Sequence, residues 1–523
     1  MTSKYDTYTS PLAERNASPE MLRLWSARHK FNMWRRVWLA VAEAQHELGL
    51  PVTKEQVGEL RAVVERKNAD GTVGITDEEI QNAEKHEREL RHDVMAHVHA
   101  LGDSCPRARP IIHLGMTSQD VVCNADYEVI DASLDLTLTK LARAAAAIAD
   151  FASEHRRTPA LGYTHYQPAQ PTTVGRRAAQ WAYELGLCVD RLQITWASDR
   201  RRGLKGATGT QASYFALLNG SGDRVDDLEL LWEAASYGQR EAVRDGLERA
   251  DVRRDSMADL FRSVHRLTGQ TYPRVTDAFV LADLAATASV LHKIATDIRL
   301  LCNRKELDEP FESKQIGSSA MPYKRNPMRC ERICGLARFV MNLVGNAYDT
   351  AATQWLERTL DDSSNRRLSL PEAFLALDGA LDLMHNVASG LIVHEAMVKK
   401  NLMAELPFLA TENILMECVK AGGDRQTYHE LIRVHAQAAG MRVKREGLDN
   451  DLLDRLKGDP RFWSGSRGGP LRAELNWEGL MDPMRYVGRS VEQTERFVRE
   501  VIEPRRQQFA DSIAALGDSG PRV

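Results

Sequence analysis

The sequence has few cysteines and no excess of positive charge. Seven cysteines are scattered through 523 residues, an odd number without paired spacing, which favours free thiols in a reducing compartment over a disulfide framework. The formal net charge of −4 argues against binding to nucleic acid. The first thirty residues hold no apolar signal region, and no uninterrupted apolar run reaches membrane-spanning length. We therefore expect a cytoplasmic protein that binds neither nucleic acid nor membrane.

Helical periodicity dominates the chain, and no convincing alternating strand pattern is present. Apolar residues recur at helical spacing between Leu281 and Leu301 and between Leu134 and Ile148, which predicts two long helices. A chain of 523 residues with 43% hydrophobic residues is too long for one ordinary core. We expect an all-α protein in which a bundle of extended helices lies between smaller helical domains.

The most informative segment is a predicted loop from Gly317 to Pro327. It reads Gly-Ser-Ser-Ala-Met-Pro-Tyr-Lys-Arg-Asn-Pro; Pro322 and Pro327 remove backbone donors, and Gly317 permits a hinge. Apolar residues from 328 to 344 follow at helical spacing, so the loop precedes a helix. Such a cluster is most often a solvated turn. Its place at a helix N-terminus, where N–H groups attract negative charge, would instead favour an anionic ligand.

Three further segments accompany this loop. They are Leu-Arg-His-Asp-Val-Met-Ala-His-Val-His at 90–99, His-Leu-Gly-Met-Thr-Ser at 113–118 and Gly-Tyr-Thr-His-Tyr-Gln-Pro-Ala-Gln at 162–170. Together the four segments resemble the fumarase/aspartase superfamily, and within it the animal-type branch of the adenylosuccinate lyase family. The resemblance extends in order over about residues 10–454.

The resemblance implies a fold, an assembly and a reaction. The implied fold has an N-terminal helical domain (1–117), a central long-helix bundle that carries the loop (118–393) and a C-terminal helical domain (394–523). Members associate into homotetramers whose active sites are shared between subunits. The implied reaction is β-elimination of fumarate from adenylosuccinate, giving AMP, and also from SAICAR, giving AICAR, in purine biosynthesis. It requires no metal and no other cofactor.

Such an elimination needs a base for the Cβ proton, an acid for the departing nitrogen and donors for the carboxylate that accumulates charge. By resemblance, Ser318 is the base, and Lys324 and Asn326 bind the reacting carboxylate. A serine can act as a base only where N–H groups, a nearby cation and exclusion of water stabilise its alkoxide, which fits a loop that closes over substrate. His165 is implied as the acid. His92 is a second family histidine that orients or binds substrate, and only activity data separate its role from that of His165.

The implied substrate carries a phosphate and two carboxylates, so an acidic protein must concentrate positive charge locally. Arginine suits this task because its planar guanidinium binds phosphate or carboxylate through two hydrogen bonds. Outside the family context, each arginine would be read as a surface charge. The family pattern assigns substrate binding to Arg15, Asn16, Arg91, Asp93, Thr117, Ser118, Thr164, Gln270, Asn326, Glu331, Arg332, Arg358, Ser363 and Arg367. Asn16 stands where a tyrosine is often found, which weakens its assignment.

Other interpretations stay open. His92, His97 and His99 could converge on a metal, although they lack the i,i+4 histidine pair of a helical zinc site, and helix packing is the alternative for the last two. Another fumarate-releasing lyase, of the argininosuccinate lyase or aspartase type, is the nearest enzymatic alternative. A non-catalytic structural protein on the same scaffold is the third, but it would need none of the catalytic residues. The charge-rich segment 239–259 reads as an insertion that forms a solvated helix.

Overall fold

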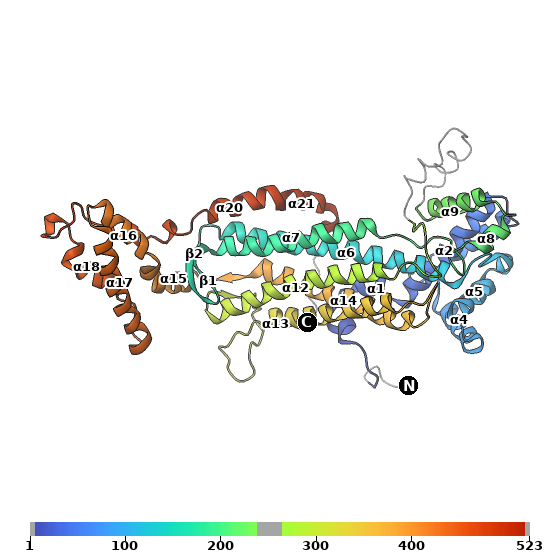
Figure 1. Cartoon of the computed structure of the whole chain (residues 1–523). Helices are drawn as coiled ribbons and strands as arrows, with labels where there is room; N and C mark the ends of the chain where they lie inside the picture. Colours follow the sequence, from blue (N-terminus) through green and yellow to red (C-terminus); the bar gives the residue numbers. More distant parts are fainter. Residues whose placement is uncertain (1–5, 238–263, 518–523) are drawn as a thin grey trace.

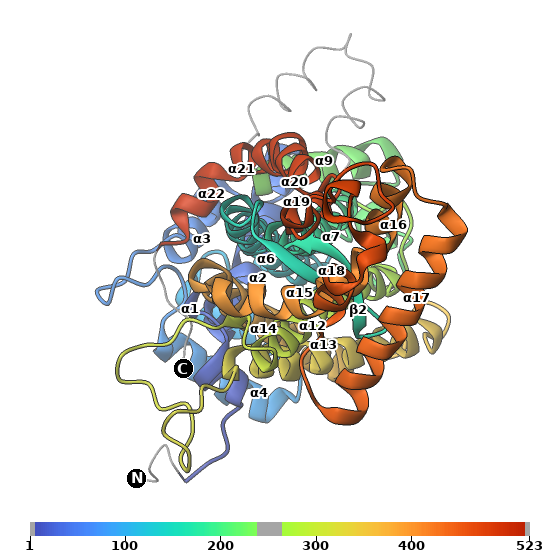
Figure 2. The same ribbon diagram turned by 90° about the vertical axis from the view of Figure 1, so that its left-hand side faces the viewer.

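The computed structural model describes residues 6–237 and 264–517. The molecule is elongated, and five long helices run side by side through its middle (Figure 1). They are α6 (Ser118–Glu154), α7 (Val174–Ser198), α12 (Val275–Asn303), α13 (Met328–Ala352) and α14 (Asp362–Gly390). Figure 2 looks along this bundle, with the C-terminal helices in front. The expected all-α class and the long central bundle are confirmed.

The bundle forms where the sequence has its apolar stripes. The stripe from Leu281 to Leu301 lies in α12, the stripe from Leu134 to Ile148 lies in α6, and the residues after the predicted loop form α13. Their buried side chains share one large apolar core with α7 and α14. The burial of one face of each helix stabilises the bundle.

Helix α12 is apolar on nearly every side. By length and composition it could cross a membrane, but it packs between α7, α13 and α14, and its buried residues belong to the shared core. A helix surrounded by others is expected to be apolar all round. Its position in the bundle therefore accounts for its composition.

Smaller groups of helices lie at the two ends of the bundle. At one end are α1 (Pro19–Leu24), α2 (Ala27–Glu47), α3 (Lys54–Val64), α4 (Asp77–Leu90), α5 (Asp93–Ser104), α8 (Ala212–Leu217) and α9 (Gly222–Tyr237). At the other are α15 (Glu395–Leu409), α16 (Thr411–Lys420), α17 (Arg425–Met441), α18 (Leu452–Gly458) and α19 (Trp477–Leu480). Each end has its own apolar cluster.

The last helices return to the bundle. They are α20 (Ser490–Phe497), α21 (Glu503–Gln508) and α22 (Ala510–Ala515), and they lie along α6 and α7 (Figure 1). Ile502 and Phe509 are buried in the central core. The division of the chain at residues 117 and 393 stays a prediction. Segment 239–259, expected to form a solvated helix, lies outside the described residues.

Two small antiparallel sheets interrupt the helices, and the sequence did not reveal them. Strands β1 (Pro159–Thr164) and β2 (Gln167–Thr173) form a hairpin between α6 and α7, and β3 (Leu307–Asp308) pairs with β4 (Ile392–Val393). The sequence showed no convincing alternating strand pattern around His165. Prolines in β2 obscured the strand pattern, and a two-stranded sheet tolerates them because its strands are both edges.

Candidate active site

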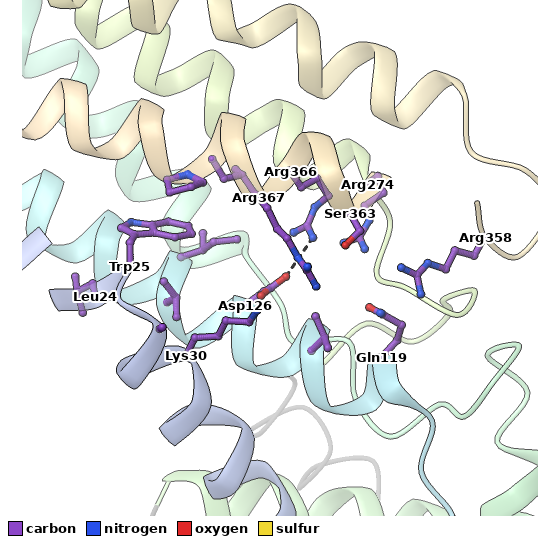
Figure 3. A pocket seen from close by; sticks show the side chains of 16 residues that line it. Leu24, Trp25, Lys30, Gln119, Asp126, Arg274, Arg358, Ser363, Arg366 and Arg367 are labelled. Carbon is purple, nitrogen blue, oxygen red and sulfur yellow. Dashed lines mark hydrogen bonds and ion pairs between the residues drawn. The ribbon is translucent and has the colours of Figure 1, made fainter. Parts of the chain in front are cut away.

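A cavity of about 320 Å³ lies where α6 and α14 begin and the α1–α2 connection crosses them (Figure 3). Its polar lining includes five cations, Lys30, Arg274, Arg358, Arg366 and Arg367, and one acid, Asp126. Trp25 and the side chains of Leu24, Val122, Val129, Ile130, Leu370 and Pro371 form its apolar part. The four arginines are ion-paired with Asp93, Asp126, Asp277 and Asp362, so the excess of positive charge is about one. The cluster of guanidinium donors still suits an anionic ligand. Three predicted binding residues, Arg358, Ser363 and Arg367, line this cavity.

Arg358 connects this cavity to a fourth predicted residue. Its Nη1 donates to Gln270 Oε1 at 3.1 Å, and its Nη2 lies 3.3 Å from Asp362 Oδ1. The backbone N–H of Gln270 donates to the Glu357 carbonyl at 3.0 Å, so the two loops hold each other. Arg358 Nε is buried without a partner in the described part of the chain. A buried, unsatisfied donor costs free energy unless a ligand accepts its hydrogen bond.

Next to the cavity, the segment 91–93 faces the start of α6. His92 begins α5 as its N-cap, and its Nε2 lies 3.4 Å from Ser118 Oγ. Arg91 ends α4 with φ 54°, a left-handed conformation that is uncommon outside glycine. Asp93 Oδ2 accepts a hydrogen bond from Arg367 Nη2 at 2.9 Å. The structure thus brings these residues to the group around Arg367.

Asp120 holds this end of α6, and the sequence analysis did not single it out. The fully buried carboxylate accepts hydrogen bonds from Thr117 N–H at 2.8 Å and Tyr214 Oη at 3.2 Å, and it pairs with buried Arg202. Its reciprocal bond with Thr117 is a capping box. The Thr-x-x-Asp spacing could have identified it as a helix start. Its contacts fix the position of Ser118.

The predicted loop from Gly317 to Pro327 is confirmed as irregular backbone at the start of α13. Ser318 Oγ accepts hydrogen bonds from the N–H groups of Ala320 at 3.4 Å and Met321 at 3.2 Å. Asn326 Nδ2 donates to the Gly317 carbonyl at 2.9 Å and closes the loop. A Cβ on Gly317 would lie 2.3 Å from the Lys324 carbonyl, so only glycine fits there. N–H groups directed at Oγ would stabilise negative charge on that atom.

The N-terminus of α13 holds an anion of its own. The buried Glu309 carboxylate accepts hydrogen bonds from the N–H groups of Arg329 at 3.1 Å and Cys330 at 2.6 Å. The expectation that this helix end favours an anion is correct in kind, but the anion is a side chain of the same protein. The first turn of α13 is therefore not free for a substrate.

His165 lies in the turn of the β1–β2 hairpin. Thr164 pairs with Gln167, so His165 and Tyr166 alone form the turn, with φ 52° and 56°. A two-residue turn with both φ values positive normally contains Asn-Gly or Gly-Gly. Two bulky residues in this conformation cost free energy, and such strain concentrates at functional sites. Both side chains are exposed.

A third group of predicted residues lies between the ends of the bundle. Arg15 and Asn16 end a short turn of helix whose backbone packs on α14, where a Cβ on Gly379 would lie 2.6 Å from the Asn16 carbonyl. Burial and the nearby charge of Arg15 lower the pKa of Arg332. Glu331, beside it, lies 3.9 Å from Arg299. Arg15 and Arg332 therefore contribute positive charge to the same region, between α14 and the start of α13.

One chain does not bring all these residues together. Ser118 begins α6 and the hairpin with His165 follows its end, so 37 helical residues, about 55 Å, separate them. The 25 residues of α13, about 38 Å, separate the Ser318 loop from the loop that carries Arg358. Figure 1 places the hairpin and the cationic cavity's helices at opposite ends of the bundle. The predicted residues thus form three groups: one around the cationic cavity, one in the hairpin with His165, and one that contains the Ser318 loop, the start of α13 and Arg15.

The histidines with a metal alternative have other contacts. His97 is buried, with its ring 3.8 Å from that of Phe31 and 5.3 Å from that of Trp34, and burial lowers its pKa to about 4. His99 lies 5.4 Å from the ring of His86. Residues 6–237 and 264–517 contain no group of three side chains placed to hold a metal. Helix packing describes His97 and His99.

Two family models match this chain. The model "Lyase" matches residues 14–216 and 264–342, and the model "Adenylosuccinate lyase C-terminus" matches residues 407–497. Among solved structures, a fumarate lyase from Mesorhizobium sp. BNC1 has a TM-score of 0.72 at 21% identity, covering 94% of this chain and all of that one. A 3-carboxy-cis,cis-muconate lactonizing enzyme from Pseudomonas putida has the same TM-score at 22% identity, covering 96% and 99%. These structures share the fold.

Curated relatives are more similar in sequence. The adenylosuccinate lyase of Saccharomyces cerevisiae is 45% identical over 97% of both chains. That of Schizosaccharomyces pombe is 44% identical over 97% of this chain and 98% of its own, and that of Schistosoma mansoni is 41% identical over 98% of both. Identity at this level over nearly the full length, together with the matching C-terminal model, shows that this chain belongs to the adenylosuccinate lyase family of the fumarase/aspartase superfamily.

Proposed function

We propose that the chain cleaves adenylosuccinate to AMP and fumarate, and SAICAR to AICAR and fumarate, by β-elimination. The single observation that carries this proposal is the geometry of Ser318, whose Oγ receives two backbone N–H groups inside a glycine-closed loop. Family membership supports the same reaction, because the curated relatives are named for it.

In the proposed reaction Ser318 Oγ, as the alkoxide, removes a proton from Cβ of the succinyl group. The electron pair moves into the adjacent carboxylate, where Lys324 and Asn326 stabilise the added charge. The C–N bond then breaks and His165 gives a proton to the departing nitrogen. The cationic cavity around Arg358, Ser363 and Arg367 holds an anionic end of the substrate, away from the bond that breaks.

The distances support a site built from several subunits. Ser318, His165 and His92 would act on one substrate, yet the length of α6 keeps His165 about 55 Å from Ser118, the neighbour of His92, and the length of α13 keeps the Ser318 loop about 38 Å from the loop that carries Arg358. A homotetramer that places one end of the bundle of each subunit against the middle of another would unite them. The seven free cysteines suit the cytoplasm as its location.

The test is the ultraviolet absorbance change after purified protein is added to adenylosuccinate, without added metal or nucleotide, with fumarate identified among the products. AMP and fumarate in equal amounts are expected. Argininosuccinate and aspartate serve as control substrates. Turnover of either control, with none of adenylosuccinate by folded protein, would assign the chain to another reaction of the superfamily.

A further inference from the structure

A second cavity, of about 400 Å³, lies at the base of the hairpin that carries His165. Its walls come from β1, β2, α7, α12 and the start of α20, which are neighbours in Figure 1. Of the described residues, three cations line it, Arg176, Arg177 and Lys293, and no acidic residue does. None of the three is among the residues assigned to the proposed reaction.

The two arginines have only neutral hydrogen-bond partners. Arg176 donates from Nε to Gln493 at 2.8 Å and from Nη1 to Gln180 at 3.4 Å. Arg177 donates from Nη2 to the Leu161 carbonyl at 2.7 Å. Among the described residues, neither forms an ion pair with a carboxylate within 4 Å. Their guanidinium groups therefore have no directly bonded carboxylate among the described residues.

Lys293 is partly neutralised. Its Nζ lies 2.9 Å from Asp297, which also accepts a hydrogen bond of 2.7 Å from Trp181 Nε1. Burial lowers the pKa of Arg177, while Glu306 and Asp297 attract its charge from beyond hydrogen-bonding distance. The excess positive charge in this cavity thus comes mainly from the two arginines.

The first turn of α7 is not what makes this cavity attractive to an anion. The N–H of Val174 donates to the Thr158 carbonyl and that of Gly175 to the His155 carbonyl, each at 2.9 Å. The N–H of Arg176 donates to the N-cap, Thr173, at 3.0 Å. These N–H groups are satisfied within the protein, so the arginine side chains are the groups that remain for a ligand.

We propose that this cavity binds a phosphate dianion, either inorganic phosphate or the phosphate group of a small metabolite, between Arg176, Arg177 and Lys293. The planar guanidinium matches two phosphate oxygens, and the volume lies within the range of small-molecule sites. Arg177 is hydrogen-bonded to Leu161 in β1, and Gly162 and Tyr163 of the same strand line the cavity, so the ligand lies beside the strand that leads to His165.

The test counts bound phosphate by equilibrium dialysis with labelled inorganic phosphate. The wild-type protein is expected to bind one more phosphate per chain than the double variant Arg176→Gln/Arg177→Gln. Since both arginines have neutral partners, these substitutions leave no carboxylate unpaired. Circular dichroism and molecular mass check folding, and Arg176→Gln alone, which loses two glutamine contacts, replaces the double variant if that variant does not fold.

The matched control is Arg425→Gln/Arg433→Gln, which removes two exposed charges from α17. Equal phosphate binding by the wild type and the Arg176/Arg177 variant would overturn the proposal, as would an equal loss in the control. The phosphate to follow is the one that the wild type binds in addition to the double variant. Its displacement by AMP would identify a nucleotide as the occupant, and no displacement would identify free phosphate. The binding count does not depend on catalysis, so it stands apart from the test of the proposed reaction.

Discussion

Arg367 Nη2 donates a hydrogen bond of 2.9 Å to Asp93 Oδ2, which joins the second turn of α14 to the first turn of α5 beside the cationic cavity. Burial alone would raise the pKa of Asp93, but the N–H of Val94 and the Arg367 guanidinium lower it below its usual value. The carboxylate therefore stays ionised and orients the guanidinium. Arg367 is held in place by a group other than the substrate.

Replacing Arg367 with glutamine is expected to weaken substrate binding more than folding. The Arg367 side chain is half-exposed, so losing its ion pair costs under about 1 kcal/mol of stability. A lost charged hydrogen bond to a substrate anion costs about 1.5–3 kcal/mol, or roughly 10–150-fold in KM. Steady-state kinetics and urea unfolding measure the two effects. Arg433→Gln, in an exposed pair with Glu430, is the control, and an equal KM in both variants would contradict the assignment.

Ser318→Ala is expected to remove turnover and keep binding. Within residues 6–237 and 264–517, the hydroxyl forms hydrogen bonds only inside its own loop, and loss of the base lowers kcat by at least about 10²–10⁴-fold. Turnover is followed by absorbance and adenylosuccinate binding by calorimetry. The neighbouring Ser319→Ala changes an exposed hydroxyl and should leave both unchanged. Normal kcat in Ser318→Ala, or equal loss in the two variants, would show that Ser318 is not the base.

Mixing two inactive proteins tests whether sites are shared. If one site takes His165 and Ser318 from different subunits, random exchange between His165→Ala and Ser318→Ala proteins restores about a quarter of the sites. Activity is measured after exchange has been verified by mass spectrometry of differently tagged subunits. Mixing each variant with a differently tagged preparation of the same variant gives the background. Complete exchange without recovered activity would place both residues of a site in one subunit.

Local patterns in the sequence predicted those parts of the fold that depend on neighbours along the chain. The stripe in α12 identifies a helix because its burial repeats every turn. The Gly317–Pro327 loop is likewise visible because glycine and proline act on their own backbone. The hairpin was missed because its turn consists of His165 and Tyr166, without the glycine that marks a two-residue turn with positive φ.

Contacts between distant segments were not predictable in the same way. Glu309 fills the N-terminus of α13 through a reversal of the chain that no spacing encodes. Lys30 and Trp25 reach the cavity of Arg358 only because α2 crosses the start of α6. The family resemblance supplied the names of site residues, but only the helix lengths reveal that one chain keeps them apart.

Stability in acid is expected to depend on Glu79. Burial alone would raise its pKa, but Arg35, the Thr76 N–H, Ser104 and Arg66 lower the pKa to about 2 from the ordinary 4.5. Because the folded state holds this carboxylate ionised, its contribution is present above pH 4.5 and is lost as the pH falls toward 2. The difference corresponds to about 3 kcal/mol.

The measurement is the free energy of urea unfolding from pH 6 down to pH 3. Glu79→Gln is expected to lower stability at pH 6 and to flatten its decline in acid. Glu78→Gln, an exposed neighbour in the same first turn of α4, is the control and should keep the wild-type slope. A wild-type slope in Glu79→Gln would mean that other carboxylates cause the decline.

Gly379 is expected to position Arg15 through the backbone of the neighbouring residue, Asn16. The Ser18 N–H donates to Asp378 Oδ2 at 2.6 Å, and a Cβ on Gly379 would lie 2.6 Å from the Asn16 carbonyl, so the N-terminal segment sits directly on α14. Gly379→Ala must displace that segment, and a displacement of about 1 Å at a binding group can lower kcat/KM by up to about 10²-fold. Gly335→Ala, in α13, places its Cβ in open space and gains the same helix propensity. Steady-state kinetics should therefore show a raised KM in Gly379→Ala alone. Equal KM values in the two variants would show that the docking of this segment on α14 does not affect substrate binding.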